Sequence, residues 1–167
     1  MKRYFTADAF YKTIYDIPPD FFAEHGISAI LSDIDNTLIP YEEEEPGEHI
    51  RAWLDALARQ GIRVAVASNN RRPRVEKFNQ TLGLFAVSNA AKPSRRAVKA
   101  VLSHFGIGRE QLCLIGDQIF TDVMAAKRAG CMCILVEPIR DKRDPFTRLK
   151  RYLERPFKGE FLGGEHL

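Results

Sequence analysis

Short apolar runs alternate with helical patterns along most of this 167-residue chain, and this alternation constrains the fold more than any other feature. Five apolar runs are expected to be strands, at residues 27–33, 62–68, 84–88, 112–116 and 132–136. Between them, apolar residues at helical spacing predict helices at residues 48–60, 73–82, 94–105 and 121–129. Alternation of this kind predicts an α/β fold with a parallel sheet and helices on both of its faces.

Length and composition favour a single domain over residues 1–167, since a chain of this size buries a proper core without disulfides or a structural metal. The net charge of +3 is too small to indicate nucleic-acid binding. The three cysteines lie in apolar runs, which indicates buried reduced thiols. No apolar run is long enough for a membrane span or a secretion signal, so we expect a cytoplasmic protein.

Polar residues that can carry chemistry follow directly after the predicted strands. In chain order they are Asp33, Asp35, Ser68, Asn69, Lys92, Asp117 and Asp122. Ligands bind beyond the carboxyl ends of parallel strands, so these side chains are expected to converge there. The like charges of Asp33 and Asp35 require compensation, and an oxygen-rich site favours Mg²⁺. Taken singly, each residue could equally well serve in a turn, a helix cap or a solvated surface.

The ordered set resembles the four motifs of the haloacid dehalogenase superfamily of aspartate-nucleophile phosphatases. The motifs are Asp33-x-Asp35-x-Thr37, Ser68, Lys92 and Gly116-Asp117-x-x-x-x-Asp122. The resemblance covers about residues 27–137. It implies a three-layer Rossmann-like core and a Mg²⁺-dependent phosphomonoester hydrolase.

The resemblance also implies a role for each carboxylate near the metal. Asp33 would attack phosphorus and form an aspartyl-phosphate. Asp35 would protonate the leaving oxygen and later deprotonate the hydrolytic water. Mg²⁺ would be held by the side chains of Asp33 and Asp117 and by the backbone carbonyl of Asp35.

The remaining candidates would serve the phosphate. Ser68 would donate a hydrogen bond to the phosphoryl group, and Asn69 beside it is a candidate for the same role. Lys92 would hold Asp33 and the phosphate by charge. Asp122 would orient Lys92 or a metal-bound water from outside the immediate ligand set.

The spacing between motifs leaves no room for a cap domain. About 30 residues separate Thr37 from Ser68, and about 23 separate Ser68 from Lys92. An open site favours a bulky substrate, such as a protein, a nucleic-acid end, a glycan or a lipid headgroup. Closure of the site by other subunits is the alternative, and the sequence does not give the oligomeric state.

Two flanking segments lie outside the expected core. Residues 1–26 are rich in aromatic side chains, and residues about 145–157 have the pattern of a basic amphipathic helix. Such a helix can lie on an anionic membrane surface or dock on the protein's own core.

The flanks extend the resemblance to one branch, the YqeG-type phosphatases of subclass IIIA. The segments that carry it are 14–17, 26–27, 33–38, 68–70, 91–93, 116–118 and 148–155. This branch is similar to the mitochondrial phosphatidylglycerophosphate phosphatases, which implies a phospholipid substrate and peripheral contact with the inner face of a membrane. Two alternatives are a phosphatase of a soluble nucleotide, sugar or protein phosphate, and a non-catalytic module that binds membranes or RNA.

Overall fold

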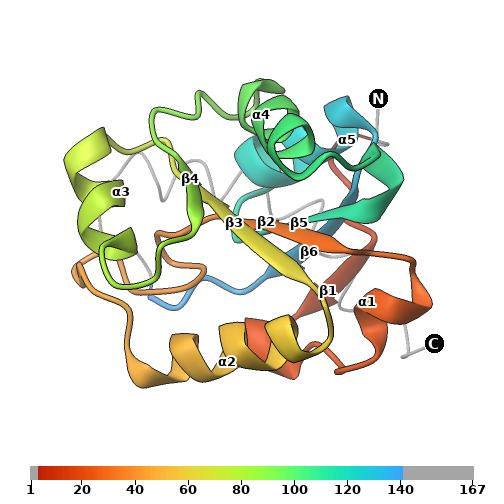
Figure 1. The fold of residues 1–167 in the computed structure, drawn as a ribbon. Coiled ribbons are helices and arrows are strands. Elements are labelled where there is room, and N and C mark those ends of the chain that lie inside the picture. Colours follow the sequence, from red (N-terminus) through yellow and green to blue (C-terminus); the bar gives the residue numbers. More distant parts are fainter. Residues whose placement is uncertain (1–3, 141–167) are drawn as a thin grey trace.

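The computed structural model describes residues 4–140, which form a six-stranded parallel sheet between two layers of helices (Figure 1). The strand order is β1-β6-β5-β2-β3-β4. The strands are β1 (Ala9–Tyr11), β2 (Ala29–Ser32), β3 (Arg63–Ala67), β4 (Phe85–Val87), β5 (Leu112–Gly116) and β6 (Met132–Val136). The α-helices are α1 (Phe21–Glu24), α2 (Glu48–Arg59), α3 (Arg72–Asn79), α4 (Arg96–Phe105) and α5 (Met124–Ala129).

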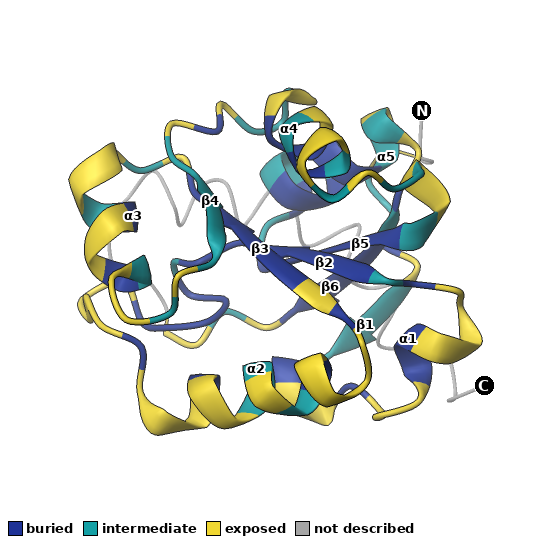
Figure 2. Cartoon of the chain, viewed as in Figure 1, coloured by how far each residue is buried: buried dark blue, intermediate teal, exposed yellow. Residues whose placement is uncertain are grey.

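The central strands are buried on both faces, as expected for a parallel sheet covered by helices (Figure 2). One face packs against α1, α2 and α3, through side chains such as Phe22, Ile50 and Phe78. The other face packs against α4 and α5, through Val98, Val101 and Ala126. The three-layer parallel fold predicted from the sequence is therefore confirmed.

All five predicted strands are present, and two predicted helices differ at their starts. Helix α4 begins at Arg96, two residues after the predicted start at residue 94. The helix expected at residues 121–129 is a π-helical turn, Ile119–Val123, followed by α5. Turns of this type recur at functional sites, and this one carries Asp122.

The amino-terminal segment belongs to the core, although the sequence predicts a core that starts at about residue 27. Strand β1 pairs in parallel with β6, with Ala9 opposite Ile134. Ile14 and Phe22 are buried against the sheet. β1 escaped prediction because it is a three-residue edge strand whose side chains are all half-buried, which leaves no clear alternation.

A carboxylate fastens this strand to the rest of the sheet. The Asp8 Oδ2 accepts a hydrogen bond of 2.8 Å from the backbone N–H of Cys133 in β6. Its Oδ1 lies 2.5 Å from Lys127 Nζ in α5. Asp8 therefore joins the start of the described chain to β6 and α5.

The three cysteines are free and buried, as predicted. The basic helix expected at about residues 145–157 lies outside the described residues. Among residues 4–140, no helix combines the length and the apolar character that crossing a bilayer requires.

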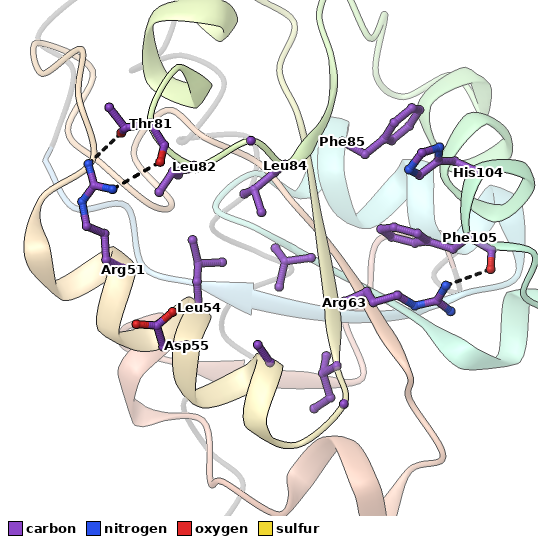
Figure 3. A pocket seen from close by; sticks show the side chains of 15 residues that line it. Arg51, Leu54, Asp55, Arg63, Thr81, Leu82, Leu84, Phe85, His104 and Phe105 are labelled. Carbon is purple, nitrogen blue, oxygen red and sulfur yellow. Dashed lines mark hydrogen bonds between the residues drawn. The ribbon is translucent and has the colours of Figure 1, made fainter.

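A groove of about 690 Å³ opens between α2, the loop before β4 and the end of α4 (Figure 3). In it, Arg51 donates to Thr81, and Arg63 donates to the carbonyl of Phe105. Arg63 and Phe85 lie at the amino-terminal ends of β3 and β4. This groove is therefore at the opposite edge of the sheet from the predicted catalytic residues.

Candidate active site

The predicted site residues come together at the carboxyl-terminal edge of the sheet. A pocket of about 210 Å³ is lined by residues that include Asp33, Asp35, Ser68, Asn69, Lys92 and Asp122. Asp117 is buried beside it, with a carboxylate oxygen within 4.8 Å of oxygens of Asp33 and Asp122. The structure thus brings all seven candidates to one place.

Strand geometry explains this convergence. The backbone N–H of Asp33 donates to the carbonyl of Ile115 at 2.9 Å, which extends the β2–β5 pairing by one residue. The N–H of Ser68 donates to the carbonyl of Val87 at 3.0 Å and extends the β3–β4 pairing. Both side chains are therefore held on rigid backbone at the point where the sheet ends.

Lys92 joins two of the carboxylates. Its Nζ lies 2.5 Å from Asp33 Oδ1 and 2.7 Å from Asp122 Oδ1, and it also donates to the carbonyl of Ala67 at 3.2 Å. All three charged side chains are buried, with exposed fractions of 7% for Lys92, 9% for Asp33 and 4% for Asp122. Asp122 therefore orients Lys92, and Lys92 contacts the candidate nucleophile.

The charges in this cluster shift the pKa values of its members. Burial raises the pKa of Asp33 to about 7, and the charges of Asp122 and Asp35 act in the same direction while Lys92 opposes them. Burial lowers the pKa of Lys92, but the negative charges of Asp122 and Asp33 outweigh it and raise that pKa overall. Lys92 therefore keeps its proton, while the Asp33 carboxylate needs more positive charge than Lys92 alone supplies.

The carboxylates of Asp33, Asp117 and Asp122 have the chemistry of a divalent cation site. All three are buried, and one oxygen from each lies within 4.8 Å of the others. Hard cations such as Mg²⁺ prefer carboxylate and carbonyl oxygens, so this donor set fits the expected metal. A cation here would also lower the pKa of Asp33, which burial and the neighbouring carboxylates raise.

Asp35 points away from that cluster into a set of hydrogen-bond donors. Its Oδ2 accepts from the Ser68 hydroxyl at 2.9 Å and from the Asn70 amide at 2.8 Å. Its Oδ1 accepts from Arg74 Nη2 at 2.9 Å and from Arg74 Nε at 3.2 Å. The two motif carboxylates therefore have different partners, although one residue separates them in the chain.

The Asn69 side chain holds the backbone of Lys92. Its Oδ1 accepts from the N–H of Lys92 at 2.8 Å, and its Nδ2 donates to the carbonyl of Lys92 at 3.2 Å. This reciprocal pair fixes the loop from which the lysine side chain extends. A direct contact between Asn69 and phosphate stays a prediction.

Gly116 allows Asp122 to approach the end of β5. A Cβ atom at position 116 would lie 2.3 Å from the Asp122 Cγ, which is far below an ordinary contact. The Asp122 Oδ2 also accepts from the backbone N–H of Gln118 at 3.2 Å. The Gly–Asp step of the fourth motif is therefore needed for packing.

Comparison with known proteins assigns the chain to a family. Residues 3–130 match the haloacid dehalogenase-like hydrolases. The chain belongs to this family. It is 32% identical over 155 residues to a probable phosphatase, YqeG, of Bacillus subtilis. The aligned residues cover 93% of this chain and 90% of that protein. The chain is therefore a haloacid dehalogenase-like hydrolase of the phosphatase type.

A second relative has a lipid phosphatase name. The chain is 26% identical over 139 residues to phosphatidylglycerophosphate phosphatase 1, chloroplastic/mitochondrial, of Arabidopsis thaliana. The match covers 77% of this chain and 40% of that protein.

Solved structures share the fold of this hydrolase. A hypothetical protein from Xanthomonas campestris superposes with a TM-score of 0.57 at 22% identity, covering 75% of this chain and 72% of that chain. The cobalt-bound deoxy-D-mannose-octulosonate 8-phosphate phosphatase of Haemophilus influenzae superposes with a TM-score of 0.56 at 16% identity. The match covers 82% of this chain and 92% of that chain. At these identities the likeness shows the fold alone.

Sequence reasoning missed two residues of this haloacid dehalogenase-like site. Asn70 has no role predicted from the sequence, and its side-chain amide donates to Asp35 Oδ2. Arg74 was not singled out, and it forms the ion pair with Asp35. A basic residue shortly after Ser68 could have indicated a partner for Asp35, but Arg71 and Arg72 also fit that description, and the sequence does not distinguish them from Arg74.

Proposed function

We propose that this chain is a Mg²⁺-dependent phosphomonoester hydrolase that uses Asp33 as its nucleophile and acts on a phospholipid headgroup, phosphatidylglycerophosphate. One observation carries the proposal. The Asp33 carboxylate sits at the end of β2 against Lys92, with oxygens of Asp117 and Asp122 within 4.8 Å. That arrangement suits an anionic nucleophile that must meet an anionic phosphate.

The reaction takes place in two steps on the chain's own residues. Asp33 attacks phosphorus, the ester P–O bond breaks, and Asp35 gives a proton to the leaving oxygen. Asp35 then takes a proton from a water molecule that attacks the aspartyl-phosphate, which releases inorganic phosphate and restores Asp33. The Ser68 hydroxyl, which donates to Asp35 Oδ2 in this structure, turns to donate a hydrogen bond to the phosphoryl group, and Lys92 balances the charge on Asp33 throughout.

Metal binding completes the charge balance. The side chains of Asp33 and Asp117 and the backbone carbonyl of Asp35 would hold Mg²⁺. When bound, the cation would neutralise the negative charges of the Asp33 carboxylate and of the phosphate. Asp122 stays on Lys92, as its 2.7 Å contact with the lysine favours.

A bulky substrate is supported by the openness of the site. In the described chain, only helices and loops connect β2 to β3 and β3 to β4, with no inserted cap. The pocket of about 210 Å³ suits a phosphate group, so the remainder of a large substrate would stay outside it.

Lipid specificity is supported by the names of two relatives. Besides the Arabidopsis protein, a chloroplastic phosphatidylglycerophosphate phosphatase 1 of Chlamydomonas reinhardtii is 25% identical over 130 residues, which span 48% of it. A soluble nucleotide, sugar or protein phosphate is the alternative substrate. We further propose that residues 1–167 form one domain, and that the segment at about 145–157 makes peripheral contact with an anionic membrane.

The proposal is tested by phosphate release from phosphatidylglycerophosphate in mixed micelles and from p-nitrophenyl phosphate. Each substrate is assayed with Mg²⁺ and with EDTA, using wild type and the Asp33→Asn variant. We expect Mg²⁺- and Asp33-dependent release that is faster from the lipid. Turnover of the small ester alone would keep the chemistry and refute the lipid assignment. No Asp33-dependent release from either substrate would refute the enzyme and favour a non-catalytic binding module.

A further inference from the structure

A partly buried ion pair behind the pocket ties Asp35 to helix α3. The Arg74 guanidinium donates twice to Asp35 Oδ1, through Nη2 at 2.9 Å and Nε at 3.2 Å. The two side chains are 15% and 12% exposed. Contact of this kind between a planar guanidinium and a carboxylate restricts rotation of both groups.

The pair divides the two oxygens of Asp35 between different surroundings. Oδ1 faces Arg74, which does not line the pocket. Oδ2 faces Ser68 and Asn70, which do line it. The oxygen available to a substrate is therefore Oδ2, and Arg74 determines which oxygen that is.

Arg74 also reaches the loop beside the pocket. Its Nη2 donates to the carbonyl of Tyr41 at 3.3 Å, and Tyr41 lines the pocket. One helical turn later, Lys77 pairs with Glu44 of the same loop. Helix α3 thus holds both the loop and Asp35 in place, and Arg74 contacts the two together.

Stability alone is a poor explanation for this arrangement. The third nitrogen of Arg74, Nη1, is buried and has no hydrogen-bond partner among residues 4–140. A buried donor without a partner costs free energy, and buried ion pairs contribute little net stability even when fully bonded. The geometry favours control of Asp35 over stabilisation of the fold.

We propose that Arg74 is a positioning residue that keeps Asp35 Oδ2 directed at the leaving oxygen of the substrate. This inference rests on the proposed function. In the step it serves, Oδ2 carries a proton in place of the hydrogen bond that it accepts here from the Ser68 hydroxyl. That proton passes to the ester oxygen while the bond from that oxygen to phosphorus breaks and Asp33 bonds to phosphorus. Arg74 gives up no proton, because its guanidinium remains charged throughout.

Dependence on the leaving group separates positioning from general damage to the structure. An alkoxide leaving group needs the proton from Asp35, whereas p-nitrophenolate is stable as an anion and needs it far less. The value of kcat/KM reports the steps up to transfer of the phosphoryl group to Asp33, so later hydrolysis does not obscure the comparison.

The experiment measures kcat/KM for phosphatidylglycerophosphate in mixed micelles, the alkyl ester, and for p-nitrophenyl phosphate, the aryl ester, with Mg²⁺ in wild type, Arg74→Gln and Arg74→Lys. Arg72→Gln is the matched control, since Arg72 is exposed on the same helix and pairs only with Glu76 among the described residues. We expect Arg74→Gln to lower kcat/KM for the alkyl ester by about 10–100-fold and for the aryl ester by less than about 3-fold. Arg74→Lys keeps the charge and should recover part of the loss, and Arg72→Gln should match wild type.

Equal losses on both esters, or no loss on either, would overturn the positioning role while leaving the proposed function in place. The melting transition of Arg74→Gln shows whether that variant folds. If it does not fold, Arg74→Lys must lose more activity on the alkyl ester than on the aryl ester, and equal losses in Arg74→Lys would overturn the positioning role. A wild-type protein that turns over neither ester refutes the proposed function itself, and the role of Arg74 falls with it.

Discussion

The ammonium of Lys92 lies 2.5 Å from the carboxylate of Asp33, although the two residues are 59 positions apart in the chain. Each is buried, and each depends on the other for compensation of its charge. Asp122 contacts the same ammonium from the far side. The cluster holds two carboxylates against one cation, so its chemistry and its stability are linked.

Replacement of Lys92 by methionine tests that link. Lys92→Met keeps the length of the side chain but leaves two buried carboxylates without their cation, so we expect a loss of about 3–5 kcal/mol in the free energy of unfolding. Activity should fall below detection as well. Urea unfolding of the metal-free protein measures the first effect, with the exposed Lys99→Met on α4 as control. A stability equal to that of wild type would contradict the charge balance described for the cluster.

Asp33 predicts how the stability of the metal-free protein depends on pH. Its pKa is raised from 3.8 to about 7 in the folded state, so the folded protein holds this proton more tightly than the unfolded chain does. The contribution of Asp33 to stability is therefore greatest at about pH 4 and below, and it falls as the pH rises towards 7. Mg²⁺ requires the carboxylate, so it should raise the melting temperature more at pH 8 than at pH 5.

Thermal unfolding with Mg²⁺ and with EDTA at the two pH values checks this prediction. The Asp33→Asn variant is the control, and its Mg²⁺-induced shift should be small at both. A shift in wild type that is as large at pH 5 as at pH 8 would be the contrary result.

Gly116 should tolerate no side chain. In Gly116→Ala the new Cβ would meet Asp122 at 2.3 Å, so the carboxylate must move and Lys92 loses one of its two carboxylate partners. We expect kcat/KM to fall by about 10-fold or more, since small displacements at a site are costly. Gly47→Ala is the matched control, because nothing lies within 4 Å of a Cβ there and its φ is −74°. Phosphatase assays measure kcat/KM of the two variants, and equal values for Gly116→Ala and Gly47→Ala would contradict the prediction.

The amino-terminal strand should depend on Asp8. Asp8→Ala removes the acceptor of the Cys133 N–H and the partner of Lys127, so we expect a loss of about 1–3 kcal/mol in the free energy of unfolding. Kinetic constants should stay close to those of wild type, because Asp8 does not line the pocket. Asp20→Ala serves as control, since Asp20 makes no side-chain hydrogen bond at the start of α1. An unchanged unfolding curve for Asp8→Ala would show that β1 is held by other contacts.

The sheet could be predicted because its strands are apolar on both faces and are separated by helical patterns. β2 and β5 are fully buried, so continuous apolar runs marked them. β1 could not be found in this way, since its residues are half-exposed at an edge. The π-helical turn at Ile119–Val123 also has no separate sequence signature, because its residues continue an ordinary helical pattern.

The site could be predicted where a residue directly follows a strand. Asp33 and Ser68 are examples, because the end of a strand fixes their position in space. Arg74 lies six positions after Ser68, on a helix whose orientation the sequence does not specify. The neighbouring Arg72 has the same chemistry but pairs with Glu76 on the surface. Only the packing of α3 against the sheet distinguishes the two arginines.

The strand order has a consequence for how the protein is made. Of the described strands, β1 is the first to leave the ribosome and its partner β6 is the last. During synthesis, β1 therefore waits for more than a hundred residues before it can pair. The pocket waits as well, since Asp117 and Asp122 follow β5 near the end of the described chain. A nascent chain halted before residue 117 would hold Asp33 but neither Asp117 nor Asp122, so under the proposed mechanism hydrolytic activity cannot begin until nearly all of the sheet has been synthesised.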